Sequence, residues 1–512
     1  MADKVSVDPD SNHLTAVEGG KFEEEVRVKL PAKGVIPTID VYFLTDATGS
    51  MGDVIKEVNN HSQEIVDGLQ EKARSVGADI RFGAGNYTDF DVNHGTNGFE
   101  HQESLTYDYD KVKAAIANWS TFNNGTTAEQ QLYALDWLAQ PPNGSAGWRA
   151  DAKRIVLWFG DAPGHDPIPQ STSGEQHDIS TSLVVKKLQQ QDIFVLAFDT
   201  TGSGGGSSPG LDTDPDDHGN RGSGADAGQA STITGATNGQ FAESVKTDEV
   251  VQKILDIGGA AITEIRDLKL VPSKSIRPFV GSREEIVPRG GERTLQGGQP
   301  HEVTFDVPFT GLSQARGKPP ETDPVTVRGK LEVFVDGSSA GKKDVDIAVP
   351  DLSGTYRIQN AKSEYFLETD PNYAKNGGLV HQGTSSDGDH QKWDLIPVSG
   401  GGYTIKNKDS GITRYIEVKG QSAENGAEIL THDNPDGRHK QWQFIPTGAD
   451  EQGRLVFQIQ NVNATQKAGR KMALDLSGRQ KPEDSKVVQW KYWGDYPDWK
   501  WVHNQHFRLI PA

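Results

Sequence analysis

The sequence contains no cysteine, so disulfide bonds, thiol nucleophiles and Cys-ligated zinc sites are all excluded. Basic residues are scarce, because 52 Lys and Arg stand against 72 Asp and Glu, which gives a formal net charge of −20. A nucleic-acid partner is therefore not expected, since phosphate binding requires a basic surface. Apolar runs are short, and no window approaches the roughly 20 consecutive apolar residues of a membrane-spanning helix.

The start of the sequence, Met1 to Val5, lacks the basic and then apolar stretch of a secretory leader. We therefore expect a protein that is either cytoplasmic or released from the cell by a non-classical route. The apolar content of 34% is supplemented by 57 glycines, which together match an ordinary soluble composition. At about 100 to 200 residues per domain, a chain of 512 residues is expected to form about three domains.

Four almost continuously apolar runs indicate buried parallel strands, and helical spacing lies between them. The runs cover residues 39–44, 80–82, 155–159 and 193–198. Strands that alternate with helices predict an open, doubly wound α/β sheet. An aspartate follows each strand, and the carboxyl ends of parallel strands meet at one edge of a sheet. We therefore expect four acids to gather there: Asp46, Asp89, Asp161 and Asp199.

Residues 267–350 show no helical period but alternate apolar and polar side chains, which predicts an all-β antiparallel sandwich of about seven short strands. Residues 22–30 alternate in the same way, although they precede the α/β pattern. We therefore predict that an α/β domain of residues 37–265 is inserted into a sandwich formed by residues 1–36 and 266–350.

The stretch from residue 201 to residue 220 is rich in Gly, Ser, Pro and Asp and is predicted to be a surface excursion. Within it, Gly206, Ser208 and Gly210 have the spacing of a hydrolase nucleophile turn. A proline follows the serine and no helix begins there, so we interpret this as a chance match.

Oxygen-bearing side chains cluster where the first buried strand gives way to a helix. Asp46, Thr48 and Ser50 place one carboxylate and two hydroxyls on a single turn, and such oxygen ligands suit Mg²⁺ or Ca²⁺. One carboxylate cannot neutralise a divalent ion, so Asp161 and Glu129 are expected to contribute from other loops. This set carries few negative charges and leaves a coordination position for an acidic group of a partner. The alternative is an ordinary helix N-cap.

These residues, with the segments 82–89, 126–129 and 160–165, resemble the von Willebrand factor A fold with its metal-ion-dependent adhesion site, closest to the I-like domain of integrin beta subunits. The resemblance covers about residues 37–265 and implies metal ligation by the set Asp46, Thr48, Ser50, Glu129 and Asp161. It also implies flanking calcium sites at Asp53, Asp89 and Asn124, although Val54 and Thr126 stand where further acids are expected. His165, next to this set, is interpreted as a loop-stabilising residue, with a catalytic base as the alternative.

The last 160 or so residues contain an internal repeat. Three similar segments end at Pro397, Pro446 and Pro511, each preceded by an aromatic residue at Trp393, Trp442 or Phe507. Three copies of a four-strand unit predict a closed threefold β structure, because one copy cannot bury its own hydrophobic face.

The repeat, residues 351–512, resembles the ricin B-type β-trefoil lectins, whose units carry a Gln-x-Trp signature; here it reads Gln391-Lys-Trp393, Lys440-Gln-Trp442 and Gln505-His-Phe507. The resemblance implies carbohydrate binding through an acid, an aromatic platform and a polar residue before the signature. The third unit matches best, and its predicted sugar-binding residues are Asp475, Trp490, Asn504 and Gln505. The first unit offers Glu368, His381 and His390, and the second offers Glu417 and His432, without an aromatic platform at the matching place. The alternative for these two is a decayed, structural role.

The sequence therefore predicts a multidomain, non-enzymatic adhesion or recognition protein. Its expected partners are a carbohydrate or glycoconjugate at the trefoil and an acidic protein ligand at a Mg²⁺ or Ca²⁺ site in the α/β domain. Two alternatives remain open at this level. One is a metal-assisted hydrolase with a lectin targeting module, and the other is a lectin-targeted toxin or defence protein.

Overall fold

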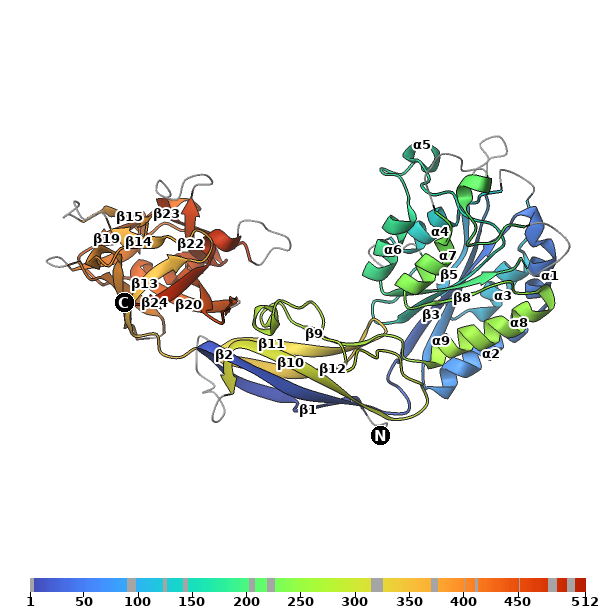
Figure 1. Cartoon of the computed structure of the whole chain (residues 1–512), viewed down its shortest axis with the longest axis horizontal. Helices are drawn as coiled ribbons and strands as arrows, with labels where there is room; N and C mark the ends of the chain where they lie inside the picture. Colours follow the sequence, from blue (N-terminus) through green and yellow to red (C-terminus); the bar gives the residue numbers. More distant parts are fainter. Residues whose placement is uncertain are drawn as a thin grey trace.

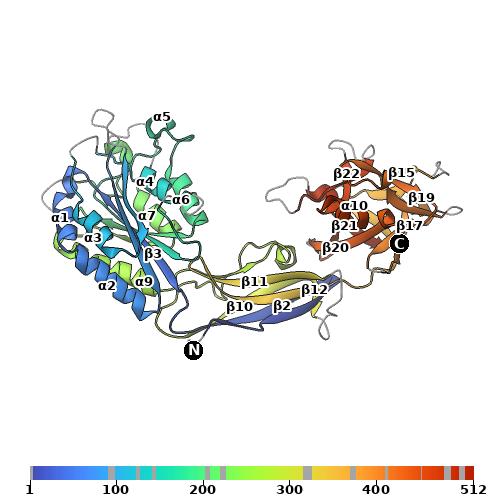
Figure 2. The same cartoon turned by 180° about the vertical axis from the view of Figure 1, so that it is seen from behind.

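The protein has three parts in a row, an α/β unit at one end, a connecting sheet in the middle and a trefoil at the other end (Figure 1). Figure 2 shows the same arrangement from behind. The computed structural model describes residues 4–89, 98–122, 127–140, 146–201, 208–218, 226–314, 326–369, 376–399, 401–409, 413–450, 452–477, 486–494 and 502–512.

The α/β unit is built on a sheet with the strand order β5-β4-β3-β6-β7-β8. All neighbours pair in parallel except the edge strand β5, which is antiparallel to β4. The strands are β3 (Thr38–Asp46), β4 (Asp79–Tyr87), β5 (Phe99–Thr106), β6 (Lys153–Gly160), β7 (Ile193–Asp199) and β8 (Gln240–Ala242). Every residue of β6 and β7 is buried, because helices cover both faces of the sheet.

The helices of the α/β unit separate into two layers, one on each face of the sheet (Figure 1). Alternate residues of β3 show why: Val41 and Phe43 pack into one apolar core, whereas Tyr42 and Leu44 pack into the other. The first layer contains α1 (Gly52–Asn60), α2 (Ser62–Ser75), α3 (Tyr109–Ala117), α8 (Val250–Lys253) and α9 (Gly259–Thr263). The second contains α4 (Gln131–Leu138), α6 (Thr181–Gln190) and α7 (Gln229–Ala236), and the short α5 (Gln170–Ser173) lies above it.

Two helical segments are interrupted in ways that their apolar spacing does not predict. His61 has non-helical backbone angles and its ring hydrogen-bonds to the Glu57 carbonyl at 2.9 Å, which separates α1 from α2. The helical segment that ends the α/β unit contains a π-helical turn, η4 (Ile254–Gly258), between α8 and α9. The glycine pair at this junction, Gly258 and Gly259, lies close against Leu69 and Lys72 of α2, so a larger side chain here would make tight contacts with α2.

The connecting sheet contains two strands that precede the α/β unit in sequence and four that follow it. They are β1 (Ser6–Asp8), β2 (Ser11–Leu30), β9 (Leu268–Pro272), β10 (His301–Gln314), β11 (Val327–Val335) and β12 (Ser338–Ala348). Val26, Val28 and Leu30 are buried at alternate positions of β2 and pair with the β10 strand. The α/β unit therefore enters the chain between β2 and β9.

This sheet differs from the predicted sandwich of about seven short strands. Within the described part of residues 267–350 there are four strands, because residues 273–300 form turns and the 3₁₀ helix η5 (Arg277–Val280). Strand β2 is 20 residues long, and its two ends pair with different partners, so the strands join into one sheet. A bulge between Thr310 and Leu312 interrupts its ladder with β10 at Gly311, whose φ of +74° favours glycine.

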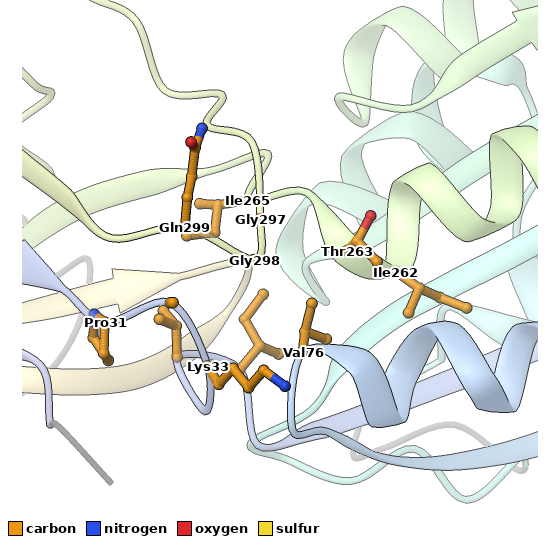
Figure 3. A pocket seen from close by; sticks show the side chains of 12 residues that line it. Pro31, Lys33, Val76, Ile262, Thr263, Ile265, Gly297, Gly298 and Gln299 are labelled. Atoms are coloured by element: carbon orange, nitrogen blue, oxygen red, sulfur yellow. The ribbon is translucent and has the colours of Figure 1, made fainter.

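A buried ion pair joins the α/β unit to the connecting sheet. Lys153 Nζ, at the start of β6, lies 2.6 Å from Asp336 Oδ2 in the β11–β12 turn, and both side chains are 0% exposed. Asp336 Oδ1 also accepts hydrogen bonds from the backbone nitrogens of Arg266 and Asp267, at 2.8 and 2.6 Å. Beside this contact, a cavity of about 20 Å³ lies between the two connecting segments, lined by Val76, Ile262 and their neighbours (Figure 3).

The trefoil confirms the predicted threefold repeat, because its described strands fall into three successive units of four. The first unit has β13 (Gly354–Asn360), β14 (Phe366–Thr369), β15 (Gly378–Gly383) and β16 (Lys392–Pro397). The second has β17 (Tyr403–Asn407), β18 (Arg414–Val418), β19 (Ala427–His432) and β20 (Gln441–Ala449). The third has β21 (Leu455–Asn461), β22 (Met472–Ser477), β23 (Lys486–Lys491) and β24 (Phe507–Pro511), with α10 (Val462–Ala468) after β21.

The three signature aromatics, Trp393, Trp442 and Phe507, are all 0% exposed and form part of the trefoil core. Sheet closure follows from the pairing of the last strand, β24, with the first, β13. The trefoil is tied to β2 of the connecting sheet by the Gly19 nitrogen, which donates to the Gly453 carbonyl at 2.9 Å. In the part of the chain that the structure describes, no helix is long and apolar enough to cross a membrane.

Candidate functional site

The first predicted site begins where β3 ends. Asp46 is 0% exposed, and its Oδ1 accepts a hydrogen bond from the Thr48 nitrogen at 2.8 Å. Thr48 has an extended backbone that turns the chain into the 3₁₀ helix η1 (Gly49–Met51). The Thr48 and Ser50 hydroxyls lie 3.3 Å apart. The predicted carboxylate and the two hydroxyls therefore share one turn, with Ser50 exposed at its outer side.

Strand register brings a second carboxylate to this turn. β3 and β6 pair in parallel up to Thr45 and Phe159, so their ends lie side by side. Asp161, one residue beyond β6, is buried, and its Oδ1 accepts a hydrogen bond from Ser50 Oγ at 3.0 Å. Asp46 and Asp161, 115 positions apart in the sequence, therefore meet at the carboxyl edge of the sheet.

The third acid, Glu129, lies in the loop before α4. Its nitrogen donates to the Pro163 carbonyl and its carbonyl accepts from the His165 nitrogen, both at 2.9 Å. These bonds pair the Glu129 loop with the loop that follows Asp161. Glu129 Oε2 and Asp46 Oδ2 are both buried and have no hydrogen-bond partner among the described residues. A buried carboxylate oxygen without a hydrogen-bond partner lowers the stability of the fold. A group that bonds to these two oxygens would remove this cost.

The pKa shifts of these acids have the same origin. Burial, followed by the charge of Asp161, raises the pKa of Asp46 to about 8. Burial, followed by neighbouring acids of which Asp46 is the first, raises the pKa of Glu129 to about 11. Burial also raises the pKa of Asp161, against hydrogen bonds from Ser208 and Ser50. The fold therefore disfavours the ionised form of these acids, and a bound cation would stabilise that form.

The donor chemistry fits a hard divalent cation, since all the groups are carboxylate or hydroxyl oxygens. Among the residues that the structure describes, no three His, Asp or Glu side chains converge as a metal-binding group on their own. A cation here would therefore be held by Asp46 and Asp161 together with the hydroxyls of Thr48 and Ser50, with Glu129 in support.

The residues predicted for flanking sites differ in their surroundings. Asp53 lies in the first turn of α1 and is exposed. Asp89 is buried, accepts a hydrogen bond from Gln130 Nε2 at 3.0 Å, and lies 3.4 Å from His165 Nε2. His165 thus connects the Asp89 and Glu129 loops. Asn124 and Thr126 lie outside the described residues.

Ser208 is a member of the first site that sequence reasoning missed. Its hydroxyl donates to Asp161 Oδ2 at 2.8 Å, and the Gly210 nitrogen donates to the Asp161 carbonyl at the same distance. Leu211 is fully buried, so this part of the predicted surface excursion packs against the site. The available signal was its position after β7, whose last residue, Asp199, is buried at the same edge.

The second predicted site lies on the β22–β23 hairpin of the trefoil. Asp475 pairs with Val488 and Ala473 pairs with Trp490, so Asp475 and Trp490 lie on the same face. Asp475 is 7% exposed, and burial raises its pKa to about 7 against a hydrogen bond with Gln505. Trp490 is half-buried, and its Nε1 is among the buried atoms without a hydrogen-bond partner in the described structure.

The two polar residues before β24 have different roles. Gln505 is 0% exposed; its Nε2 donates to the Lys491 carbonyl and its Oε1 accepts from the Trp493 nitrogen, both at 2.8 Å. Gln505 therefore holds Asp475 and the hairpin in place from inside the fold. Asn504 is partly exposed, and its amide donates to the Leu476 carbonyl at 3.3 Å.

The corresponding acids of the other two units are engaged by the protein itself. Glu368 accepts a hydrogen bond from Gln391 at 2.7 Å and lies 3.1 Å from His381 and 3.7 Å from His390. In all three units, the residue at the first signature position contacts the acid.

In the second unit this residue is a lysine. Lys440 Nζ lies 3.1 Å from Glu417 Oε2, and His439 lies 3.4 Å from the same oxygen. His432, opposite Tyr415, occupies the place of Trp490, and its Nδ1 lies 3.0 Å from Asp433 Oδ1. Asp475 is therefore the acid with the least internal compensation of the three.

Parts of the chain are similar to known proteins. The alpha-protein kinase vwkA of Dictyostelium discoideum is 26% identical over 168 residues, which are 32% of this chain and 25% of that protein. The chain thus spans about a quarter of the length of this curated relative.

Among solved structures, the designed threefold symmetric protein ThreeFoil is 22% identical with a TM-score of 0.25, over 31% of this chain and 99% of that chain. An exo-beta-1,3-galactanase from Clostridium thermocellum is 22% identical with a TM-score of 0.26, over 41% of this chain and 39% of that chain. Residues 347–432, the first trefoil unit and most of the second, match the family model described as Ricin-type beta-trefoil lectin domain-like.

Proposed function

We propose that this protein is a non-enzymatic recognition protein that binds carbohydrate through the third unit of its trefoil. The match of residues 347–432 to the ricin-type lectin family supports carbohydrate binding by this part of the chain. The observation that carries the choice of unit is the position of Asp475 and Trp490 on the same face of one hairpin, with Gln505 as the acid's hydrogen-bond partner.

The chemistry of these two side chains suits a sugar ring. A carboxylate accepts hydrogen bonds from two hydroxyls at once, and such charge-assisted bonds are about twice as strong as neutral ones. The face of an indole covers the apolar side of the ring. In the first and second units, by contrast, a sugar hydroxyl would have to displace His381 from Glu368 or Lys440 from Glu417.

A glycan array tests this proposal with a matched pair of variants. Asp475→Asn keeps the shape of the side chain but removes its charge, and we expect the array signal to fall by about tenfold or more, as for one lost hydrogen bond to a charged group. Glu368→Gln makes the same change in the first unit and should leave the signal unchanged. A signal lost in Glu368→Gln but kept in Asp475→Asn would assign the sugar site to the first unit.

We further propose that the carboxyl edge of the α/β sheet binds Mg²⁺ or Ca²⁺ and, through it, an acidic group of a protein partner. The resemblance of residues 37–265 to von Willebrand factor A domains supports this, as do the unpaired buried oxygens of Asp46 and Glu129. A bound cation with an open coordination position supplies a Lewis acid for the partner's carboxylate. Thr48 and Ser50 would complete its oxygen ligands, and Ser208 would hold Asp161 in orientation.

Titration calorimetry of the chelator-treated protein with MgCl₂ and CaCl₂ tests this second proposal. One equivalent of cation should be taken up at the Asp46 and Asp161 pair, and Asp161→Ala should abolish the uptake. Failure of the unmodified protein to take up either cation would refute the proposal.

A further inference from the structure

A cleft between the connecting sheet and the trefoil is a second binding surface next to the predicted sugar site. Its volume is about 570 Å³, which is within the range of small-ligand sites. The connecting sheet contributes Lys274 and Arg328, and the trefoil contributes Lys471, Tyr492 and His506. The two walls are held together, because the Leu455 nitrogen of the trefoil donates to both Glu18 carboxylate oxygens at 3.1 Å.

The charge of this cleft is opposite to that of the protein. The chain has a formal net charge of −20, yet the described residues that line the cleft include Lys274, Arg328 and Lys471 and no acid. Lys274 is exposed and has no ion-pair partner among the described residues. Arg328 is 65% exposed and lies 3.8 Å from Asp346, at the outer limit of an ion pair. His506 adds no charge at neutral pH, because burial lowers its pKa to about 4.

The cleft continues the face of the hairpin that carries Asp475 and Trp490. The Tyr492 nitrogen donates to the Lys471 carbonyl at 2.9 Å, which extends the ladder of β22 and β23 by one position in the same register. Lys471, Ala473 and Asp475 are alternate residues and therefore lie on one side of the strand. At about 3.3 Å per residue, Lys471 lies about 13 Å along the strand from Asp475.

We propose that the ligand of the trefoil is an acidic oligosaccharide, with one ring at Asp475 and Trp490 and a carboxylate or sulfate group in the cleft among Lys274, Arg328 and Lys471. This inference rests on the proposed carbohydrate binding and specifies its ligand. An anionic group in the cleft is attracted by Lys274 and Arg328 of the connecting sheet and by Lys471 of the trefoil. A cleft lined by charges of one sign raises the local concentration of ligands of the opposite charge. The carboxylate and sulfate share this chemistry, and the glycans used in the test distinguish them.

The test uses the full chain and immobilised glycans in neutral, carboxylated and sulfated versions of the same backbone. The unmodified protein should bind the acidic versions about five- to thirtyfold more tightly than the neutral one, as for two or three exposed ion pairs. The double variant Lys274→Gln, Arg328→Gln should lose this preference and keep its affinity for the neutral glycan. The double variant Arg27→Gln, Lys29→Gln removes the same charge from exposed positions of β2 and should keep the preference.

The outcomes separate this inference from the function on which it rests. Binding of neutral and acidic glycans with equal affinity overturns the inference and leaves carbohydrate binding in place. A preference that survives in the Lys274 and Arg328 variant overturns it as well. Absence of binding to every glycan overturns both. A preference for sulfated glycans alone, or carboxylated glycans alone, supports the inference and identifies the acidic group.

Discussion

Replacement of Asp46 by Asn should change the stability of the α/β unit in opposite directions with and without a divalent cation. Without a cation, Asp46 is a buried acid whose pKa is raised to about 8 by burial and by the charge of Asp161, and Asp46 in turn helps to raise the pKa of Glu129. Folding at neutral pH must protonate this acid or bury its charge, and the Asn side chain carries neither cost, so Asp46→Asn should be about 1 to 3 kcal/mol more stable than the unmodified protein, comparable to the cost of an unpaired buried polar group. With the cation, the unmodified protein should gain stability and the variant should not.

The size of the cation effect follows from mass action. A ligand at a hundred times its Kd stabilises the folded state by about 2.7 kcal/mol. For a unit of about 200 residues, each kcal/mol shifts Tm by about 2 to 4 °C, so the expected shift is about 5 to 11 °C. Differential scanning calorimetry in chelator, MgCl₂ and CaCl₂ measures it.

The control is Asp53→Asn, which removes the same charge from an exposed position in α1. Its cation shift should equal that of the unmodified protein if the ion sits at Asp46. A cation shift of the same size in Asp46→Asn would refute the reasoning, as would a variant that is less stable than the unmodified protein in chelator.

Two further predictions concern the trefoil and the junction between the parts. Burial raises the pKa of Asp475 to about 7, so the carboxylate form is present above that pH and lost below it. Glycan affinity measured by calorimetry should therefore fall by about tenfold for each pH unit below 7. An affinity that is constant from pH 8 to pH 5 would show that the Asp475 carboxylate makes no contact with the sugar. Lys153→Met leaves the Asp336 carboxylate buried without its cation and should lower the free energy of unfolding by about 3 to 5 kcal/mol in a denaturant titration. A loss below about 1 kcal/mol would mean that the backbone nitrogens of Arg266 and Asp267 are enough to stabilise the buried carboxylate.

Elements whose pattern is set locally were predictable from the sequence. The apolar runs at residues 39–44, 155–159 and 193–198 lie within β3, β6 and β7. The threefold repeat was visible because each unit contributes an aromatic residue at the same place to a shared core. In the first case neighbouring residues carry the signal, and in the second it lies in the similarity of three short segments.

Other features depend on contacts between distant segments. The π-helical turn at Ile254–Gly258 lies against α2, and the single connecting sheet depends on β2, which pairs with β1 near one end and with β12 near the other. Ser208 was missed because the composition of its loop suggests solvent exposure. In the structure this loop follows β7, and the Ser208 hydroxyl donates a hydrogen bond to Asp161. The spacing of side chains along one segment does not indicate which distant segments it will contact.

The sequence by itself determined the types of side chain available: oxygen ligands after parallel strands, an acid and an aromatic residue in the third repeat, and an excess of negative charge. Only the tertiary structure decided how each is compensated. In the first unit it placed His381, His390 and Gln391 against Glu368, and in the second it placed Lys440 against Glu417. In the third unit Gln505 is the main group against Asp475. It also gathered Lys274, Arg328 and Lys471 from separate parts into one cleft. The reason is physical: the strength of an ionic or hydrogen-bonding group depends on its neighbours in space and on its burial, and both are set by the folded chain.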